Sequence, residues 1–222
     1  MGMESSQDHT EGMNEQHTHQ RITITPGMLY YGNTIILLST LNPDGSTNIA
    51  PMSSSWALGD TIVLGMALDS QTAHNLKERK EAVLNLPGPE LWSSVERLGD
   101  LTDAPQGRRQ HGHGSIPYAD KFAEIGLTRA SSQQVRCAGI DECRLQIEAV
   151  AERCVADIHH EFLIAQLHVL EVHADPNIVV PGTQHIDPTA WRPLVYNFRH
   201  YFTLGPQLGE SSISQTPTRH ES

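Results

Sequence analysis

The stretch STLNPDGSTNIAPMSSSWAL, residues 39–58, decides the fold that we predict. It continues an apolar run rich in β-formers, Thr34–Leu41, and then reaches Asp44-Gly45, which is typical of a tight turn because Gly accepts a positive φ at no steric cost. The second half does not alternate polar and apolar side chains as an ordinary strand does. Instead it contains Pro51 and three consecutive serines, Ser53–Ser55. We therefore expect a hairpin whose second strand is irregular and whose backbone groups a ligand can approach.

Around this hairpin the sequence predicts about six strands and three short helices. Strands are expected from β-forming runs and from period-2 alternation, and helices from cap residues and from apolar residues spaced i, i+4, i+7. The predicted strands cover residues 34–41, 61–68, 82–86, 145–149 and 163–169, and an aromatic segment follows near the C-terminus. The predicted helices cover residues 72–80, with Thr72 as the cap, residues 90–99, and residues 115–126, from Ser115 to Gly126. Strands do not alternate strictly with helices, so a doubly wound parallel sheet is not expected. A closed or partly closed antiparallel barrel, mainly β with inserted helices, fits the pattern.

The chain of 222 residues suits one domain with polar ends. Residues 1–20 hold almost no apolar side chains, and residues 206–222 are mostly Ser, Thr, Gln, Glu and Pro. Such segments bury too little surface to offset their ordering entropy. We therefore expect flexible segments at 1–20 and 206–222 and one compact domain over 21–205.

Charge and composition argue against several classes of partner. A net charge of −11, from 26 acidic and 15 basic residues, disfavours nucleic acid and anionic membranes, which attract basic faces. No apolar run approaches the roughly 18 residues of a membrane span, and no signal peptide is visible at the N-terminus. The cysteines are odd in number and lack CxxC spacing, which favours free thiols in a reducing compartment, so a cytoplasmic location is expected.

No metal site is expected from the sequence. The His-Gly-His-Gly run over 111–114 lacks a carboxylate or thiol partner at ligand spacing. Walker, G-x-G-x-x-G and G-x-S-x-G motifs are also absent from the sequence.

Three motifs in order resemble the flavin-reductase-like branch of the FMN-binding split-barrel family. Residues 39–58 carry N-x-A-P-x-S after a D-G turn, residues 70–75 resemble S-x-K-T-x-x-N, and Val83-Leu84-Asn85 supplies V-N. Further points of likeness are Leu98–Thr102, Lys121 with Gly126-Leu127, His160, Tyr196, Arg199 and Tyr201. The resemblance implies an antiparallel split barrel over most of residues 30–205.

The first motif suits the polar edge of an isoalloxazine ring. Backbone N–H groups in a segment of small residues can approach ring carbonyls and nitrogens closely, and Pro51 stiffens that approach although it lacks a donor. The predicted ring-binding residues are Asn48, Ala50, Pro51, Met52, Ser53, Ser54 and Ser55. The alternative interpretation is a Ser-rich connection whose hydroxyls are satisfied internally.

The second motif suits a phosphate. Ser70, Gln71, Thr72 and Asn75 are the predicted contacts, because hydroxyls and amides at a helix start form an anion site that the helix dipole favours. Alternatively, Thr72 acts only as an N-cap. The family often has Lys where this chain has Gln71, so an arginine such as Arg199 is expected to compensate.

The resemblance implies an FMN-dependent oxidoreductase, in particular an NAD(P)H-dependent flavin reductase that passes hydride from nicotinamide C4 to flavin N5. NADH or NADPH is the expected donor, and no Rossmann domain is needed for it. His160 is the candidate catalytic residue, which orients the nicotinamide or supplies a proton, and a surface histidine is the alternative. Two other functions stay open: oxidation or reduction of a small metabolite by bound FMN, and an FMN-binding electron carrier without NAD(P)H turnover.

The resemblance also implies a homodimer with flavin sites near the subunit interface. The aromatic residues between Trp191 and Phe202 give weaker independent support, because interface cores are enriched in aromatics. Packing of this segment on its own barrel is the alternative. An oxygenase or another flavoprotein is the expected acceptor of the reduced flavin or its electrons.

Overall fold

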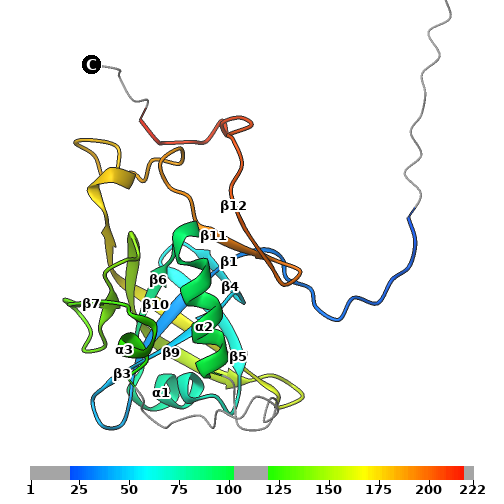
Figure 1. Ribbon diagram of the computed structural model, residues 1–222, viewed down its shortest axis with the longest axis vertical. Coiled ribbons are helices and arrows are strands. Elements are labelled where there is room, and N and C mark those ends of the chain that lie inside the picture. Colours follow the sequence, from blue (N-terminus) through cyan, green and yellow to red (C-terminus); the bar gives the residue numbers. More distant parts are fainter. Residues whose placement is uncertain (1–20, 103–119, 218–222) are drawn as a thin grey trace, which may run out of the picture.

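The computed structural model describes residues 21–102 and 120–217 (Figure 1). Several sequence-based expectations lie outside these ranges. They are the N-terminal segment 1–20, the loop over 103–114 with its histidines, the helix start at Ser115 and the last residues of the C-terminal tail.

The main sheet has seven strands, and every neighbouring pair is antiparallel. Its order is β3-β2-β6-β9-β10-β5-β4, so β3 and β4 are the two edges. The strands are β2 Ile36–Leu41, β3 Thr47–Met52, β4 Ser55–Leu58, β5 Thr61–Ala67, β6 Glu81–Leu86, β9 Leu145–Ala156 and β10 Phe162–Ala174. Only Ser53 and Ser54 join the two edges along the chain, so the sheet must curl into an open barrel that splits at these serines.

The predicted hairpin is confirmed, but its second strand is regular: β3 pairs with β2 from Thr47 to Met52 without a register shift, and only Ser53 and Ser54 lie outside the ladders. Gly45 has φ +85°, and the Ser46 N–H donates to Asp44 Oδ1 at 2.9 Å, which closes the turn between β2 and β3. Pro51 lies opposite Leu37 on edge strand β3. A proline is tolerated there because an edge strand has one side without a partner that needs its missing N–H.

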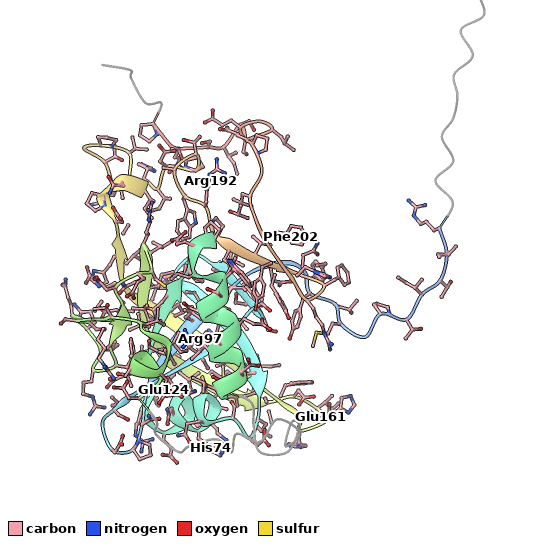
Figure 2. The ribbon with its side chains drawn as sticks, viewed as in Figure 1. His74, Arg97, Glu124, Glu161, Arg192 and Phe202 are labelled. Carbon is pink, nitrogen blue, oxygen red and sulfur yellow. The ribbon has the colours of Figure 1, made fainter. Side chains whose placement is uncertain are left out.

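Within the described residues, three α-helices interrupt the strands. They are α1 Gln71–Arg79, α2 Trp92–Thr102, which follows a 3-10 turn over Pro89–Leu91, and α3 Lys121–Ile125. Gly126 ends α3 with φ +80°, as predicted. Figure 2 labels Arg97 on α2 and Glu124 on α3, and the Arg97 guanidinium donates to the Glu124 carbonyl at 2.7 Å, which ties the two helices together.

The predicted cap of α1 is wrong. Ser70 is the N-cap, and its hydroxyl accepts the Ala73 N–H at 3.2 Å. Thr72 lies two residues further into the helix and is 3% exposed. Ser and Thr are both good caps, so sequence alone does not decide between two candidates two residues apart.

The structure has more strands than the sequence predicted. A smaller sheet has the order β1-β11-β12, formed by β1 Tyr31–Thr34, β11 Leu194–Asn197 and β12 His200–Thr203. A short ladder joins β7 Arg129–Ala130 to β8 Gly139–Ile140, and a 3-10 turn spans Pro176–Ile178. The C-terminal aromatic segment is docked as predicted, because Tyr196 and Tyr201 pack against a buried core.

Strand β2 separates two cores. Leu38 faces the barrel interior with Leu64 and Leu167, while Leu37 packs with Leu98 and Phe122 under the helices. All six side chains are at most 1% exposed. Burial on both faces explains why β2 does not alternate polar and apolar residues; its two polar residues, Ser39 and Thr40, are themselves buried.

Three further findings concern the described residues. The three cysteines are free thiols, and burial raises the pKa of Cys137 to about 12. No described helix is long and apolar enough to cross a membrane. Within residues 21–102 and 120–217, no group of three or more His, Cys, Asp or Glu residues is placed to hold a metal ion.

Candidate functional site

A cavity of about 470 Å³ lies where the barrel splits. This volume is within the range of sites for small molecules and cofactors. Helix α2 forms one wall through Val95, Gly99 and Thr102, and strand β5 contributes Gly65 with its neighbours. The segment Ala50–Ser54 forms the wall at the split, so the first predicted motif lines the cavity.

At the split of the barrel, between β3 and β4, two backbone N–H groups have no acceptor among the described residues. Ser53 and Ser54 lie between the ladders of β3 and β4, and the Ser54 carbonyl accepts the Gly65 N–H at 2.9 Å. Neither serine N–H donates to another residue that the structure describes. An unpaired N–H beside a buried wall is costly, so both groups are suited to a ligand that brings acceptors.

Three aromatic rings form the opposite end of the cavity, and a fourth, which does not line it, lies beside them. Tyr30, Tyr196 and Tyr201 line it, with ring centroids 5.7 Å apart for Tyr30–Tyr196 and 5.3 Å apart for Tyr196–Tyr201. Trp92 at the start of α2 stands 6.1 Å from the Tyr201 ring. Tilted aromatic walls of this kind favour a planar aromatic ligand.

Glu96 and Tyr201 form a hydrogen-bonded pair at the same end. The Tyr201 hydroxyl donates to Glu96 Oε2 at 2.6 Å, and both residues line the cavity. Burial, followed by the neighbouring Glu96 carboxylate, raises the pKa of the Tyr201 phenol above its usual value. The phenol is therefore a stable hydrogen-bond donor across the physiological pH range.

The start of α1 forms the polar end. Ser70 and Thr72, two of the predicted phosphate contacts, both line the cavity. The Ser70 hydroxyl is already used, because it donates to the Ala67 carbonyl at 2.8 Å and accepts from Ala73. Thr72 Oγ1 accepts from Asn48 Nδ2 at 3.2 Å and donates to no other residue that the structure describes.

Asn48 and Asn75 stand behind the cavity wall rather than in it. Asn75 is fully buried and donates to Thr40 Oγ1 and Asn42 Oδ1 at 3.1 and 2.9 Å. Asn48 is 5% exposed and bonds to Thr40, Thr72 and Lys121. Both amides link β2, α1 and their neighbours, so their visible role is to fix the geometry of the site.

Four other predicted residues are not brought to the cavity of a single chain. Gln71 is exposed and donates to Asn75 Oδ1 at 2.8 Å, and Ser55 begins β4 beyond the cavity wall. Arg199 lies at the tip of the β11–β12 hairpin, where its Nε is 3.3 Å from Met28 Sδ. His160 is in the β9–β10 turn, beside a shallow hollow that it shares with His74 and Glu161; Figure 2 labels the latter two residues.

Sequence reasoning missed Tyr30, Glu96 and the part that Lys121 has in the site. Lys121 was named only as a point of likeness. Its Nζ donates to Asn48 Oδ1 and the Ile49 carbonyl, both at 2.9 Å, and to Thr102 Oγ1 at 3.2 Å. Sequence reasoning missed this role because Lys121 and Asn48 are 73 positions apart in the chain, and no local pattern joins them.

Comparison with known proteins agrees with this geometry. A family model described as flavin reductase like domain matches residues 28–205. The protein of Bacillus subtilis strain 168 that carries the name Uncharacterized protein YdfE is 42% identical over 207 residues, which cover 91% of this chain and 98% of that protein.

Solved structures share the fold. Flavoredoxin of Desulfovibrio vulgaris (Miyazaki F) matches with a TM-score of 0.70 at 17% identity, over 88% of this chain and 99% of that one. Nitrilotriacetate monooxygenase component B from Bacillus cereus matches with a TM-score of 0.70 at 15% identity, over 87% of this chain and 100% of that one. The predicted antiparallel split barrel with inserted helices is confirmed.

Proposed function

The chain belongs to the family of flavin reductase like domains, and on that premise we propose that it binds FMN in the cavity at the split of the barrel and reduces it with NADH or NADPH. Family membership makes the chain a flavin-related oxidoreductase. The choice of FMN and of a nicotinamide donor is the proposal.

The free N–H groups of Ser53 and Ser54 are the observation that carries this proposal. Two adjacent donors on a wall of small residues suit the carbonyls and nitrogens along one edge of an isoalloxazine ring. The tilted aromatic rings of Tyr196 and Tyr201 suit the plane of the same ring at the other end. Polar donors and a planar apolar surface in one cavity are what a flavin requires.

The residues of the chain have binding and positioning roles. A bound flavin itself supplies the redox chemistry, by accepting hydride from a nicotinamide. The serine amides hold the ring edge, the hydroxyl of Thr72 faces the polar end, and the Glu96–Tyr201 pair fixes one phenol at the cavity wall. No nucleophile is needed for this reaction.

Calorimetric titration of the apoprotein tests the proposal. We expect FMN and riboflavin to bind, FMN more tightly than riboflavin. FAD is expected to bind more weakly than FMN, because its adenylate group would have to extend out of the polar end of the cavity. Oxidation of NADH or NADPH in the presence of the bound flavin is expected in a spectrophotometric assay. If neither flavin binds, the proposed function is wrong.

An electron carrier is the second candidate, favoured by the fold that the chain shares with a flavoredoxin. The same assay separates the two functions. A protein that binds FMN but oxidises neither NADH nor NADPH above the rate of free FMN would be a carrier. In either case we propose an oxygenase or another flavoprotein as the acceptor, in line with the monooxygenase component of similar fold, and a cytoplasmic location.

We also propose a homodimer, but at a surface other than the one expected from the C-terminal aromatics. Trp56, Leu58, Phe162 and Ile164 are 57%, 76%, 53% and 43% exposed. The strand register places them on one face of β4, β5 and β10, because cross-strand partners share a face.

This apolar sheet face, defined by Trp56, Leu58, Phe162 and Ile164, is continuous with the cavity. Gly65 pairs with Ile164, and Gly65 also lines the cavity. A second copy on this face would therefore close the cavity on its open side. His160 precedes β10 at the border of the same face, so a role in catalysis requires that it act across the dimer.

Light scattering tests the dimer. We expect a mass near twice 24.5 kDa, and Ile164→Glu is expected to give the monomer, because a charge would be buried in an apolar contact. Val172→Glu is the matched control, since Val172 is 54% exposed on the same strand but lies beyond the pairing with β5. A wild-type monomer that binds FMN tightly would contradict the proposal.

A further inference from the structure

Lys121 is a partly buried cation behind the polar end of the cavity, where it bonds to the cavity-lining Thr102 but does not line the cavity itself. Its ammonium uses all three of its donors, on Asn48 Oδ1, the Ile49 carbonyl and Thr102 Oγ1. None of these three acceptors carries a charge. Within the part of the chain that the structure describes, no carboxylate forms an ion pair with Lys121.

The ammonium fixes the orientation of the Asn48 amide. An ammonium can only donate, so the Asn48 oxygen must face Lys121 and its NH₂ group must face the other way. That NH₂ group donates to Thr40 Oγ1 at 3.3 Å and to Thr72 Oγ1 at 3.2 Å. The oxygen of Thr72 is thereby engaged as an acceptor.

Of the three hydroxyls that line the polar end, those of Ser70, Thr72 and Thr102, only that of Thr72 keeps its proton for a ligand. Ser70 donates its proton to the Ala67 carbonyl, and Thr102 donates its proton to the Leu98 carbonyl at 2.7 Å. The Thr72 hydroxyl lines the cavity and donates to no residue that the structure describes. A hydroxyl with its oxygen engaged as an acceptor and its proton free can donate to a ligand in the cavity.

We propose that the phosphate group of the flavin is held at the Thr72 hydroxyl by a donor relay from Lys121 through Asn48, and that this relay supplies the positive charge that position 71 lacks. The proposal rests on the proposed function, in that a flavin occupies the cavity. Gln71 does not supply this interaction itself, because its amide donates to Asn75 within α1.

The layout of the cavity leaves room for a ring at one end and a phosphate at the other. Helix α2, labelled in Figure 1, runs from Trp92, whose ring lies beside Tyr201, to Thr102, which bonds to Lys121. Ten residues of helix span about 15 Å, which leaves room for a ribityl chain between ring and phosphate. Glu96 and Asp100 also line the cavity, and Glu96 is engaged with Tyr201 near the aromatic end.

The energetics of Lys121 agree with an anion at this position. Burial lowers the pKa of the Lys121 ammonium to about 8, because the charged form loses solvation without gaining a carboxylate. A phosphate dianion near the relay would restore the missing opposite charge. Riboflavin would not supply this charge, because it has a neutral hydroxyl in place of the phosphate.

Replacement of Lys121 by Met tests the relay. We expect Lys121→Met to weaken FMN binding by about ten- to a hundred-fold and to change riboflavin binding by less than about two-fold, measured by calorimetry on the full chain. Lys77→Met is the matched control, because it removes the same charge from an exposed site on α1. Equal losses of FMN affinity in both variants would mean that net charge, and not the relay, is responsible, and would overturn the proposal.

The terminal hydroxyl gives a second test. Thr72→Val is expected to weaken FMN more than riboflavin by about ten-fold or more, whereas Thr72→Ser keeps the hydroxyl and is expected to keep most of the FMN affinity. Thermal unfolding of each apoprotein shows whether a variant is folded. Wild-type protein that binds both ligands equally, or Lys121→Met with unchanged FMN affinity, would overturn the relay; failure to bind either ligand would instead contradict the proposed function.

Discussion

Replacement of Gly65 by Leu is expected to weaken flavin binding by about a hundred-fold, because an added isobutyl group would occupy ligand space beside the serine amides. Gly65 lines the cavity on β5 with its N–H bonded to the Ser54 carbonyl. A Cβ atom there meets only the Ser54 Cβ, at 3.5 Å, which is ordinary contact. The fold should therefore tolerate the substitution while the ligand does not.

The graded control is Gly65→Ala. A single methyl group fits against Ser54, so a loss of less than about ten-fold is expected for the alanine variant. Calorimetry with FMN and riboflavin measures both variants, and light scattering checks that the oligomeric state is unchanged. If the leucine variant bound flavin as tightly as wild type, the flavin would not lie at the split of the barrel.

Replacement of Glu148 by Gln is expected to lower the free energy of unfolding by about 3–5 kcal/mol, because it removes a buried negative charge that accepts hydrogen bonds from three backbone N–H groups and a histidine. Glu148 on β9 is 1% exposed. Its carboxylate accepts the N–H groups of Gln133, Gln134 and Val135 at 2.8, 2.6 and 3.1 Å, and it bonds to His173 Nε2 at 2.7 Å. The amide nitrogen of a glutamine would face a donor at one of these positions.

The pH dependence of stability has a defined sign at Glu148. Burial opposes ionisation, but the backbone N–H groups and His173 outweigh it, so the pKa of the Glu148 carboxyl lies below its usual value of 4.5. A depressed pKa gives stability that is present above about pH 4.5 and is lost as the pH falls through the lower, folded-state value.

Urea unfolding at pH 7 and pH 4 measures this effect. The loss caused by Glu148→Gln should be largest at pH 7 and should shrink toward acid pH, where the wild-type carboxyl is itself protonated. Glu152→Gln is the matched control, since Glu152 is exposed on the same strand. A difference below about 1 kcal/mol at pH 7 would mean that the loop over 133–135 does not depend on this carboxylate.

The hairpin and the strands were predictable because their signals are local. Asp44-Gly45 fixes a turn through backbone sterics, and the run Ile36–Leu41 reads as buried because each of its side chains is apolar or small. The short strands of the smaller sheet were missed for the opposite reason. Strand β1 has four residues and pairs with β11, more than 160 positions away, so no periodicity within either segment identifies the pair.

In the candidate site, too, the sequence identified the residues of local motifs but not their orientation in the fold. Ser53, Ser54, Ser70 and Thr72 were identified because small hydroxyl residues beside a turn or a helix start form contiguous motifs, and all four line the cavity. Asn75 was assigned to the phosphate on the same reasoning, although in the fold it is fully buried and bonded to β2. A one-turn spacing on a helix shows which residues share a side, but it does not show whether that side faces a ligand or a strand.

By itself the sequence indicated the antiparallel barrel, the turn at Gly45 and the wall of small residues at the split, because steric limits on backbone angles and the spacing of apolar and small side chains can be read from neighbouring residues. Tertiary structure alone decided which polar groups face the cavity. Lys121 meets Asn48 across 73 residues, whereas Arg199 is held at a hairpin tip and bonds to Met28. Hydrogen-bond donors and acceptors are paired by distance in space, and only the closed fold sets that distance.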